Sequence, residues 1–130
     1  MAFICIIIQK TSDFSNNIKG IRDRLSVMAS IHSESVDRLF EAVLGLESLD
    51  ECYDFFSDIC TIKEVLDMAQ RLDTAILLEN GASYQEISRE IGISTATIGR
   101  VSRCLNYGSG GYRTAIKKLE TNGGENKNEI

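Results

Sequence analysis

The amino-acid sequence predicts an all-α domain, and three observations support this fold class. The 130 residues contain no proline, and glycines are most closely spaced at 108–111, so few positions interrupt a helix. Apolar residues recur three and four positions apart over much of the chain, which is the spacing of one helical face. At three places a serine or threonine is followed three residues later by glutamate, a pattern typical of helix N-termini.

The first helix is expected within 35–47, where the sequence reads SVDRLFEAVLGLE. Apolar residues there follow the spacing of a single buried stripe: Val36, Leu39, Phe40, Val43 and Leu44. Ser48 and Glu51 match a capping box, so a second helix is expected to begin after Ser48. Its side chains expected in the core are Cys52, Phe55, Phe56 and Ile59.

Thr61 and Glu64 form a second predicted capping box, which begins a long helix. The residues expected inside are Val65, Leu66, Met68, Ala69, Leu72, Ala75, Ile76 and Leu78. Gly81 lies where a left-handed C-cap would end this helix. Ser83 and Glu86 form a third predicted box and begin a short helix, YQEISREI.

Residues 84–105 match a helix-turn-helix. Gly92 directly follows the short helix, at a position where a tight turn needs a residue that tolerates positive φ. Ile93 is expected to fill the corner between the helices, and Ser94 is expected to cap the second helix. Ser88 stands where alanine is commoner, and serine is small enough to fit there.

The second helix of this motif, TATIGRVSRCL, has two distinct faces. One face is predicted to be buried and carries Ile98, Val101 and Leu105. Small side chains at the front of the other face allow close approach to base edges, and its arginines supply phosphate or guanine contacts. That exposed face carries Thr95, Ala96, Gly99, Arg100 and Arg103.

Charge is divided unevenly along the chain, whose formal net charge is −5. Residues 28–83 carry 3 basic and 12 acidic side chains, a balance of −9. Residues 84–119 carry 6 basic and 2 acidic side chains, a balance of +4. The basic part coincides with the helix-turn-helix, as expected of a protein that presents one face to a polyanion.

The sequence predicts one helical domain at 28–119, preceded by a poorly ordered or extension segment at 1–27 and followed by a flexible tail at 120–130. The apolar run FICIII is far shorter than a membrane span and lacks the flanks of a signal peptide. No membrane partner is therefore expected. Met28 is interpreted as the natural start, because the amphipathic pattern begins just after it.

Several chemical functions are disfavoured by composition. The four cysteines are dispersed without a C-x-x-C pair, which disfavours a zinc site or disulfide framework and favours reduced thiols in the cytoplasm. A single histidine, His32, leaves little basis for a catalytic triad. GSGG at 108–111 lacks the lysine of a phosphate-binding loop and fits the exit of a helix. We therefore expect no enzyme, metal or cofactor.

Residues 39–116 resemble the Trp-repressor-related YerC/YecD family along their whole length. The most distinctive stretches are DECYDFF, AQRL, STATIGRVSRCLNYG and GGY. This family belongs to the tryptophan repressor superfamily. The resemblance implies an intertwined homodimer whose two helix-turn-helix motifs are spaced for successive major grooves. The residues themselves add only that the apolar helices at 34–80 would bury more surface against a second chain.

The resemblance also implies site residues. The DNA-facing positions of tryptophan repressors correspond to Gln85, Ser88, Thr95, Ala96, Thr97 and Gly99. Their effector pocket corresponds to Thr61, Arg71, Arg100 and Cys104. Cys104 replaces a serine that helps hold the ligand amino group, and Val101 replaces a glycine beside the indole. Tryptophan is therefore disfavoured, and a different small effector, or none, is favoured.

Two functional classes follow from the sequence. The first is a dimeric DNA-binding transcriptional regulator, interpreted as a repressor that occupies an operator. Its phosphate contacts would come from Arg89, Arg100, Arg103, Lys117 and Lys118. The second is a protein-interaction module that kept the fold and lost DNA binding, with the acidic helices at 34–79 as its working surface.

Overall fold

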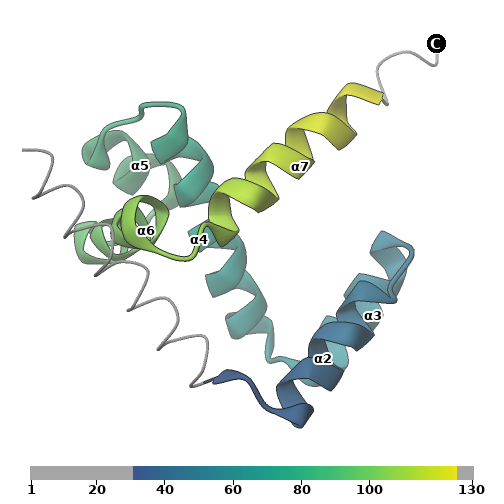
Figure 1. Ribbon diagram of the computed structural model, residues 1–130. Coiled ribbons are helices and arrows are strands. Elements are labelled where there is room, and N and C mark those ends of the chain that lie inside the picture. Colours follow the sequence, from purple (N-terminus) through teal and green to yellow (C-terminus); the bar gives the residue numbers. More distant parts are fainter. Residues whose placement is uncertain (1–30, 126–130) are drawn as a thin grey trace, which may run out of the picture. The chain divides into compact units, whose positions relative to one another are not determined.

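The computed structural model describes residues 31–125; the predictions for 1–27 and for Met28 therefore lie outside the described residues. Within the described range the chain forms six α-helices and no strand (Figure 1). The all-α class predicted from the sequence is confirmed. In chain order the helices are α2 (Glu34–Leu44), α3 (Leu49–Ile59), α4 (Ile62–Glu79), α5 (Tyr84–Ile91), α6 (Thr95–Tyr107) and α7 (Gly111–Glu125).

A serine or threonine caps the N-terminus of each helix from α2 to α6. In every case the side-chain oxygen accepts a hydrogen bond from the backbone N–H three residues later, at 3.1–3.3 Å. These bonds satisfy amide groups that a helix start would otherwise leave unpaired. The helix starts therefore follow from local sequence. The N-cap residues are Ser33, Ser48, Thr61, Ser83 and Ser94.

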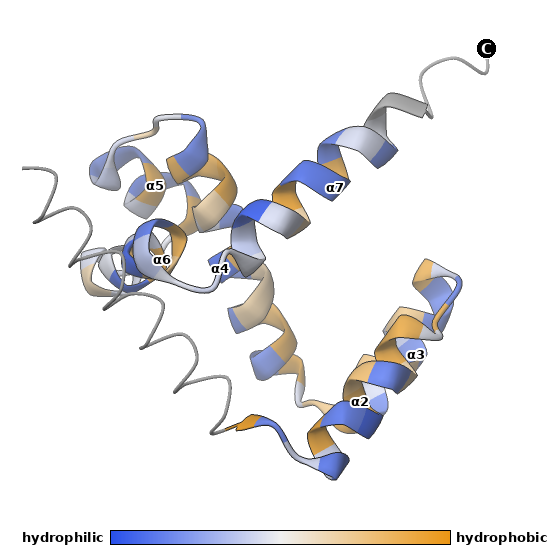
Figure 2. Cartoon of the chain, in the orientation of Figure 1, coloured by the Kyte–Doolittle hydropathy of each residue, from blue (hydrophilic) through white to orange (hydrophobic). Residues whose placement is uncertain are grey.

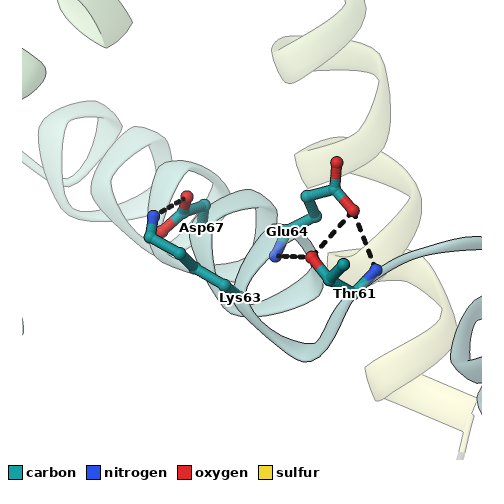
Figure 3. Close-up of polar contacts among 4 residues, drawn as sticks. All are labelled: Thr61, Lys63, Glu64 and Asp67. Carbon is teal, nitrogen blue, oxygen red and sulfur yellow. Dashed lines mark hydrogen bonds and ion pairs between the residues drawn. The ribbon is translucent and has the colours of Figure 1, made fainter.

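Two of the predicted capping boxes are complete. The carboxylate of Glu64 accepts the backbone N–H and the hydroxyl of Thr61, each at 2.8 Å (Figure 3). Glu86 makes the same pair of bonds to Ser83. Because hydrogen bonds to the backbone and hydroxyl favour the charged form, the pKa of each carboxyl lies below its usual value. At the remaining predicted box, which begins α3, Ser48 accepts the expected bond from the N–H of Glu51.

Gly81 ends α4 as predicted. Its φ of 85° lies in the left-handed region, which glycine adopts without steric cost. The Gly81 N–H donates to the carbonyl of Leu78, and the Ala82 N–H donates to the carbonyl of Leu77, each at 3.0 Å. This pair of bonds is a Schellman motif, and it fixes where the chain turns from α4 toward α5.

The chain divides into two units, Met1–Glu47 and Ser48–Ile130. In the first unit the described helix is α2. In the second unit α4 contacts α5, α6 and α7, and α6 also contacts α5 and α7. The core of this second unit gathers residues from α4, α6 and α7, namely Ala75, Val101 and Ile116. Half-buried side chains pack against it, namely Leu72, Ile76, Leu78 and Tyr112.

Part of the predicted core is not buried. Neither α2 nor α3 contains a fully buried residue, and the first turns of α4 expose their apolar side chains. Leu44 is 85% exposed, Ile59 51% and Leu66 58%. Figure 2 shows hydrophobic stretches, coloured orange, on both α2 and α3. The spacing correctly predicted one apolar face per helix, but within this chain α4 packs mainly through its second half, from Leu72 onward.

The last helix is longer than the sequence indicated. The predicted tail began at residue 120, whereas α7 continues to Glu125. The Thr121 hydroxyl donates to the backbone carbonyls of Lys117 and Lys118, at 3.2 and 2.9 Å. These bonds follow the helical geometry, so a polar composition did not end the helix here. Residues 126–130 lie outside the described part of the chain.

Candidate nucleic-acid interface

The segment from α5 to α6 has the arrangement expected of a helix-turn-helix. A turn of three residues, Gly92, Ile93 and Ser94, joins the two helices. Gly92 has a φ of 77°, and its N–H donates to the carbonyl of Ser88 at 3.0 Å. Ile87 and Ile98 are completely buried, so the two helices share an interior. The predicted turn and its glycine are confirmed.

Helix α6 buries one face and exposes the other. Ile98, Val101 and Leu105 are buried, as the sequence predicted. At the front of the opposite face Thr95 and Ala96 are exposed, close to the N-terminus of the helix. Gly99 is half-buried, and a Cβ built there would meet no heavy atom within 4 Å. Small side chains and open space therefore lie where a base edge would approach.

The arginines of α6 are available to an anion. Arg100 and Arg103 are exposed, and neither forms a salt bridge with any residue between 31 and 125. Lys117 and Lys118 on α7 are also exposed and make no salt bridge within the same range. By contrast, the guanidinium of Arg113 lies 3.4 Å from the carboxylate of Glu79. Between residues 31 and 125, Arg71 on α4 and Arg89 on α5 are likewise exposed and form no salt bridge, so the cations without an ion pair come from α4, α5, α6 and α7.

The structure divides the remaining predicted DNA-facing residues into two groups. Gln85 and Arg89 are exposed on α5. Ser88 and Thr97 are half-buried, and their hydroxyls already have partners. Ser88 donates to the carbonyl of Ile93 at 2.8 Å, and the Thr97 hydroxyl lies 3.1 Å from that of Ser94. Both residues were predicted from the sequence to face DNA, whereas these contacts were not predicted.

The predicted effector residues are not all brought together within one chain. Arg71, Arg100 and Cys104 are exposed, but Thr61 begins α4 about 15 Å along the helix axis from Arg71, at ~1.5 Å per residue. The Thr61 hydroxyl also donates to Glu64 and accepts from its N–H. The effector set therefore lacks a common pocket in the single chain.

Tyr112 is a residue near this region that sequence reasoning did not assign to a site. Burial raises its pKa, the neighbouring Cys104 raises it further, and the positive charge of Arg71 opposes the shift. The ring also packs against the core that includes Val101, which is only 3% exposed. These side chains come from α4, α6 and α7, so no local pattern could have grouped them.

Pockets lie beside the motif, between α4 and the helices α5 and α6. One of about 270 Å³ lies between α4 and the start of α6 and is lined by Lys63, Asp67, Gln70, Arg71, Ile93, Ser94 and Thr97. Lys63 pairs with Asp67 at 2.7 Å on its rim (Figure 3). The other, of about 450 Å³, lies between α4 and α5 and is lined by Gln70, Asp73, Ile76, Leu77, Glu90 and Ile91.

The described part of the chain contains neither a metal-binding cluster nor a membrane-spanning helix. Between residues 31 and 125 no group of three histidine, cysteine or acidic side chains is placed to hold a metal ion. None of the helices in that range combines the length and hydropathy needed to cross a membrane.

Comparison with known proteins gives a consistent result. The Trp repressor protein family model matches residues 34–120. The uncharacterized protein YerC of Bacillus subtilis (strain 168) is 47% identical over 90 residues, which cover 69% of this chain and 86% of that protein. The crystal structure of a TrpR-like protein from Eubacterium eligens has a TM-score of 0.69 and 44% identity, and the match covers 71% of this chain and 95% of the other.

A second solved structure, a putative Trp repressor from Staphylococcus aureus, has the same TM-score of 0.69 with 39% identity, and the match covers 72% of this chain and 93% of the other. The family match spans the helices from α2 into α7 and includes the whole helix-turn-helix. The likeness therefore extends through the described fold and is not confined to one motif. The chain belongs to the Trp repressor family.

Proposed function

We propose that the protein is a sequence-specific DNA-binding transcriptional regulator that acts in the cytoplasm as a homodimer and represses by occupying an operator. The observation that carries this proposal is the separation of the two faces of α6. Ile98 and Leu105 hold one face in the core, while Thr95 and the unpaired Arg100 lie on the exposed face. Membership of the Trp repressor family supports the same role. The proposal includes no catalytic step.

Recognition is divided between two kinds of residue. Thr95, Ala96, Thr97 and Gly99 at the front of α6 read base edges, because small side chains let the helix enter the major groove. Gln85 and Ser88 on α5 face the same duplex. The cationic side chains hold the backbone phosphates without reading sequence. They are Arg89, Arg100, Arg103, Lys117 and Lys118.

A second copy of the chain covers the exposed apolar faces. Helices α2 and α3 have no fully buried residue, and the start of α4 also exposes large apolar side chains. Such side chains are seldom left in water over three consecutive helices. A twofold dimer buries the same patch on both chains and presents two α6 helices to one duplex. Half-sites about one helical turn apart are then expected in the operator.

The proposal includes control of DNA binding by a small molecule other than tryptophan. Arg71, Arg100 and Cys104 are exposed and face an effector, and Thr61 adds a contact if it comes from the second chain. Tryptophan is disfavoured because Val101 is buried in the core at the position where an indole would need space. The exposed Cys104 is also a weak hydrogen-bond partner for an amino group.

Salt dependence of duplex binding tests the proposal. We expect the affinity for DNA to fall steeply between 50 and 200 mM salt, because each phosphate contact releases a counterion. Fluorescence anisotropy with a labelled duplex and the full chain measures this slope. A duplex that fails to bind even at 50 mM salt contradicts the proposal.

The alternative is a protein-interaction module on the same fold. The observation in its favour is the acidic character of the segment before α5, with 3 basic and 12 acidic residues at 28–83, next to exposed apolar side chains such as Phe40 and Tyr53. Such a module predicts binding to a protein partner and no salt-dependent affinity for DNA. The same titration therefore separates the two functions.

A further inference from the structure

Ser88 forms a contact that the helix-turn-helix pattern does not require. Its hydroxyl donates to the carbonyl of Ile93 at 2.8 Å, and its own carbonyl accepts the N–H of Gly92 at 3.0 Å. One half-buried residue of α5 therefore binds two of the three residues in the turn. No other described residue donates to the Ile93 carbonyl.

The held carbonyl belongs to the peptide that enters α6. Ile93 immediately precedes Ser94, the N-cap, whose hydroxyl oxygen accepts the N–H of Thr97 at 3.2 Å. A peptide unit is planar, so fixing the Ile93 carbonyl also fixes the direction of the Ser94 nitrogen. The series of contacts from the Ser88 hydroxyl through the Ile93 carbonyl to the N-cap thus sets the direction in which α6 leaves the turn.

We infer that Ser88 is a positioning residue for the recognition helix and acts through Ile93 without reading a base itself. This inference rests on the proposed DNA-binding function and refines the role that sequence comparison assigned to Ser88. The single hydroxyl proton is already donated within the protein, so it is not available to a base acceptor. The geometry therefore favours a role in orienting α6, and the experiments below distinguish this role from acceptance of a base amino group by the same oxygen.

Removing the hydroxyl should leave the fold intact and loosen that orientation. Ser88→Ala keeps the side-chain volume close to native and introduces a better helix former in α5. The Ile93 carbonyl then turns to water, and α6 samples several directions. We expect about a tenfold fall in the ratio of the affinity for the preferred sequence to the affinity for random DNA, equivalent to ~1.4 kcal/mol.

Thr74→Val is a matched control. The Thr74 hydroxyl donates to the carbonyl of Gln70 at 2.7 Å, so this variant also loses one hydroxyl-to-carbonyl bond. That bond lies within α4 and does not join two helices. Ser88→Thr is a rescue variant, since threonine retains the donor. Selection of bound duplexes from random DNA is carried out with the wild type and the three variants, all as full chains.

The base positions at which each variant loses sequence preference test the inference. We expect Ser88→Ala to weaken the preference at every base position read by α6, while Thr74→Val and Ser88→Thr keep the wild-type motif. Loss at a single base position would show that Ser88 reads that base directly and would overturn the inference. An unchanged motif in Ser88→Ala would overturn it as well.

Amide hydrogen exchange supplies a readout that does not depend on DNA. We expect Ser88→Ala to speed exchange of the amides in the turn and first turn of α6, and Thr74→Val to leave them unchanged. If the wild type selects no sequence, the proposed function fails, and exchange alone then decides whether Ser88 positions α6. Unchanged exchange at Ser94–Ile98 in Ser88→Ala would overturn the positioning role.

Discussion

Glycine-to-alanine substitution at Gly92 and at Gly99 is predicted to change stability in opposite directions. Gly92 occupies the left-handed region at the end of α5, with a φ of 77°, whereas Gly99 lies within α6. A Cβ added at either position would meet no heavy atom within 4 Å. Steric overlap is therefore absent at both sites, and the backbone conformation alone determines whether the substitution raises or lowers the free energy of unfolding.

The magnitudes follow from that difference. A left-handed conformation costs a residue with a Cβ roughly 1–2 kcal/mol, while alanine recovers about 0.4–1 kcal/mol by restricting the unfolded chain. Gly92→Ala should therefore lower the free energy of unfolding by about 1 kcal/mol. In a helix interior alanine is favoured over glycine by about 0.5–1 kcal/mol, so Gly99→Ala should raise it by that amount.

Urea unfolding followed by circular dichroism measures both effects. Protein concentration is held constant, because the stability of a dimer depends on it. With a slope of roughly 1–3 kcal/mol per molar urea, a change of 1 kcal/mol shifts the midpoint by about 0.3–1 M. A Gly92→Ala variant as stable as the wild type would refute the left-handed turn. A destabilised Gly99→Ala variant would refute the open helical site in α6.

Three further predictions concern DNA, pH and assembly. Arg103→Ala should weaken binding to all duplexes and reduce the slope of log affinity against log salt concentration by about 1, whereas Thr95→Val should change the preferred sequence. If both variants lose affinity equally for all sequences, the assignment of Arg103 to phosphates and Thr95 to bases is wrong. The capping bonds lower the pKa of Glu86 below its usual 4.5, so its contribution to stability is present above that pH and is lost as the pH falls through the lowered value. The urea midpoint of the wild type should therefore drop more on acidification than that of Glu86→Gln, and equal drops would contradict the box. Leu66→Asp should convert the proposed dimer to a monomer in sedimentation velocity, because it places a charge on an apolar face at a residue that is 58% exposed in the single chain; a variant that remains dimeric contradicts the proposed interface.

Features determined by neighbouring residues were predicted well from the sequence. The caps at Ser48, Thr61 and Ser83 depend on residues three positions apart, and the left-handed glycines depend on the helix end that precedes them. The buried face of α6 was also predicted, because its three apolar residues recur with the helical period. Local hydrogen bonding and periodicity are sufficient for such features.

Features that depend on long-range packing were not predicted. The apolar spacing in α3 and at the start of α4 was interpreted as core, yet side chains such as Ile59 and Leu66 are exposed, because periodicity does not indicate which surface covers a face. The approach of Tyr112 to Arg71 and Cys104 joins three helices. The bond from Ser88 to Ile93 requires the geometry of the turn, and no residue pattern distinguishes it from an exposed serine.

Selection of bound duplexes from random DNA, with the full wild-type chain at ~150 mM salt and no added ligand, tests the central claim most directly. We predict recovery of a palindromic sequence whose half-sites lie about one helical turn apart, because the proposed twofold dimer presents two α6 helices to successive major grooves. A selected pool that remains random, both without ligand and with small molecules from a cell extract, would contradict the claim that this protein is a sequence-specific regulator.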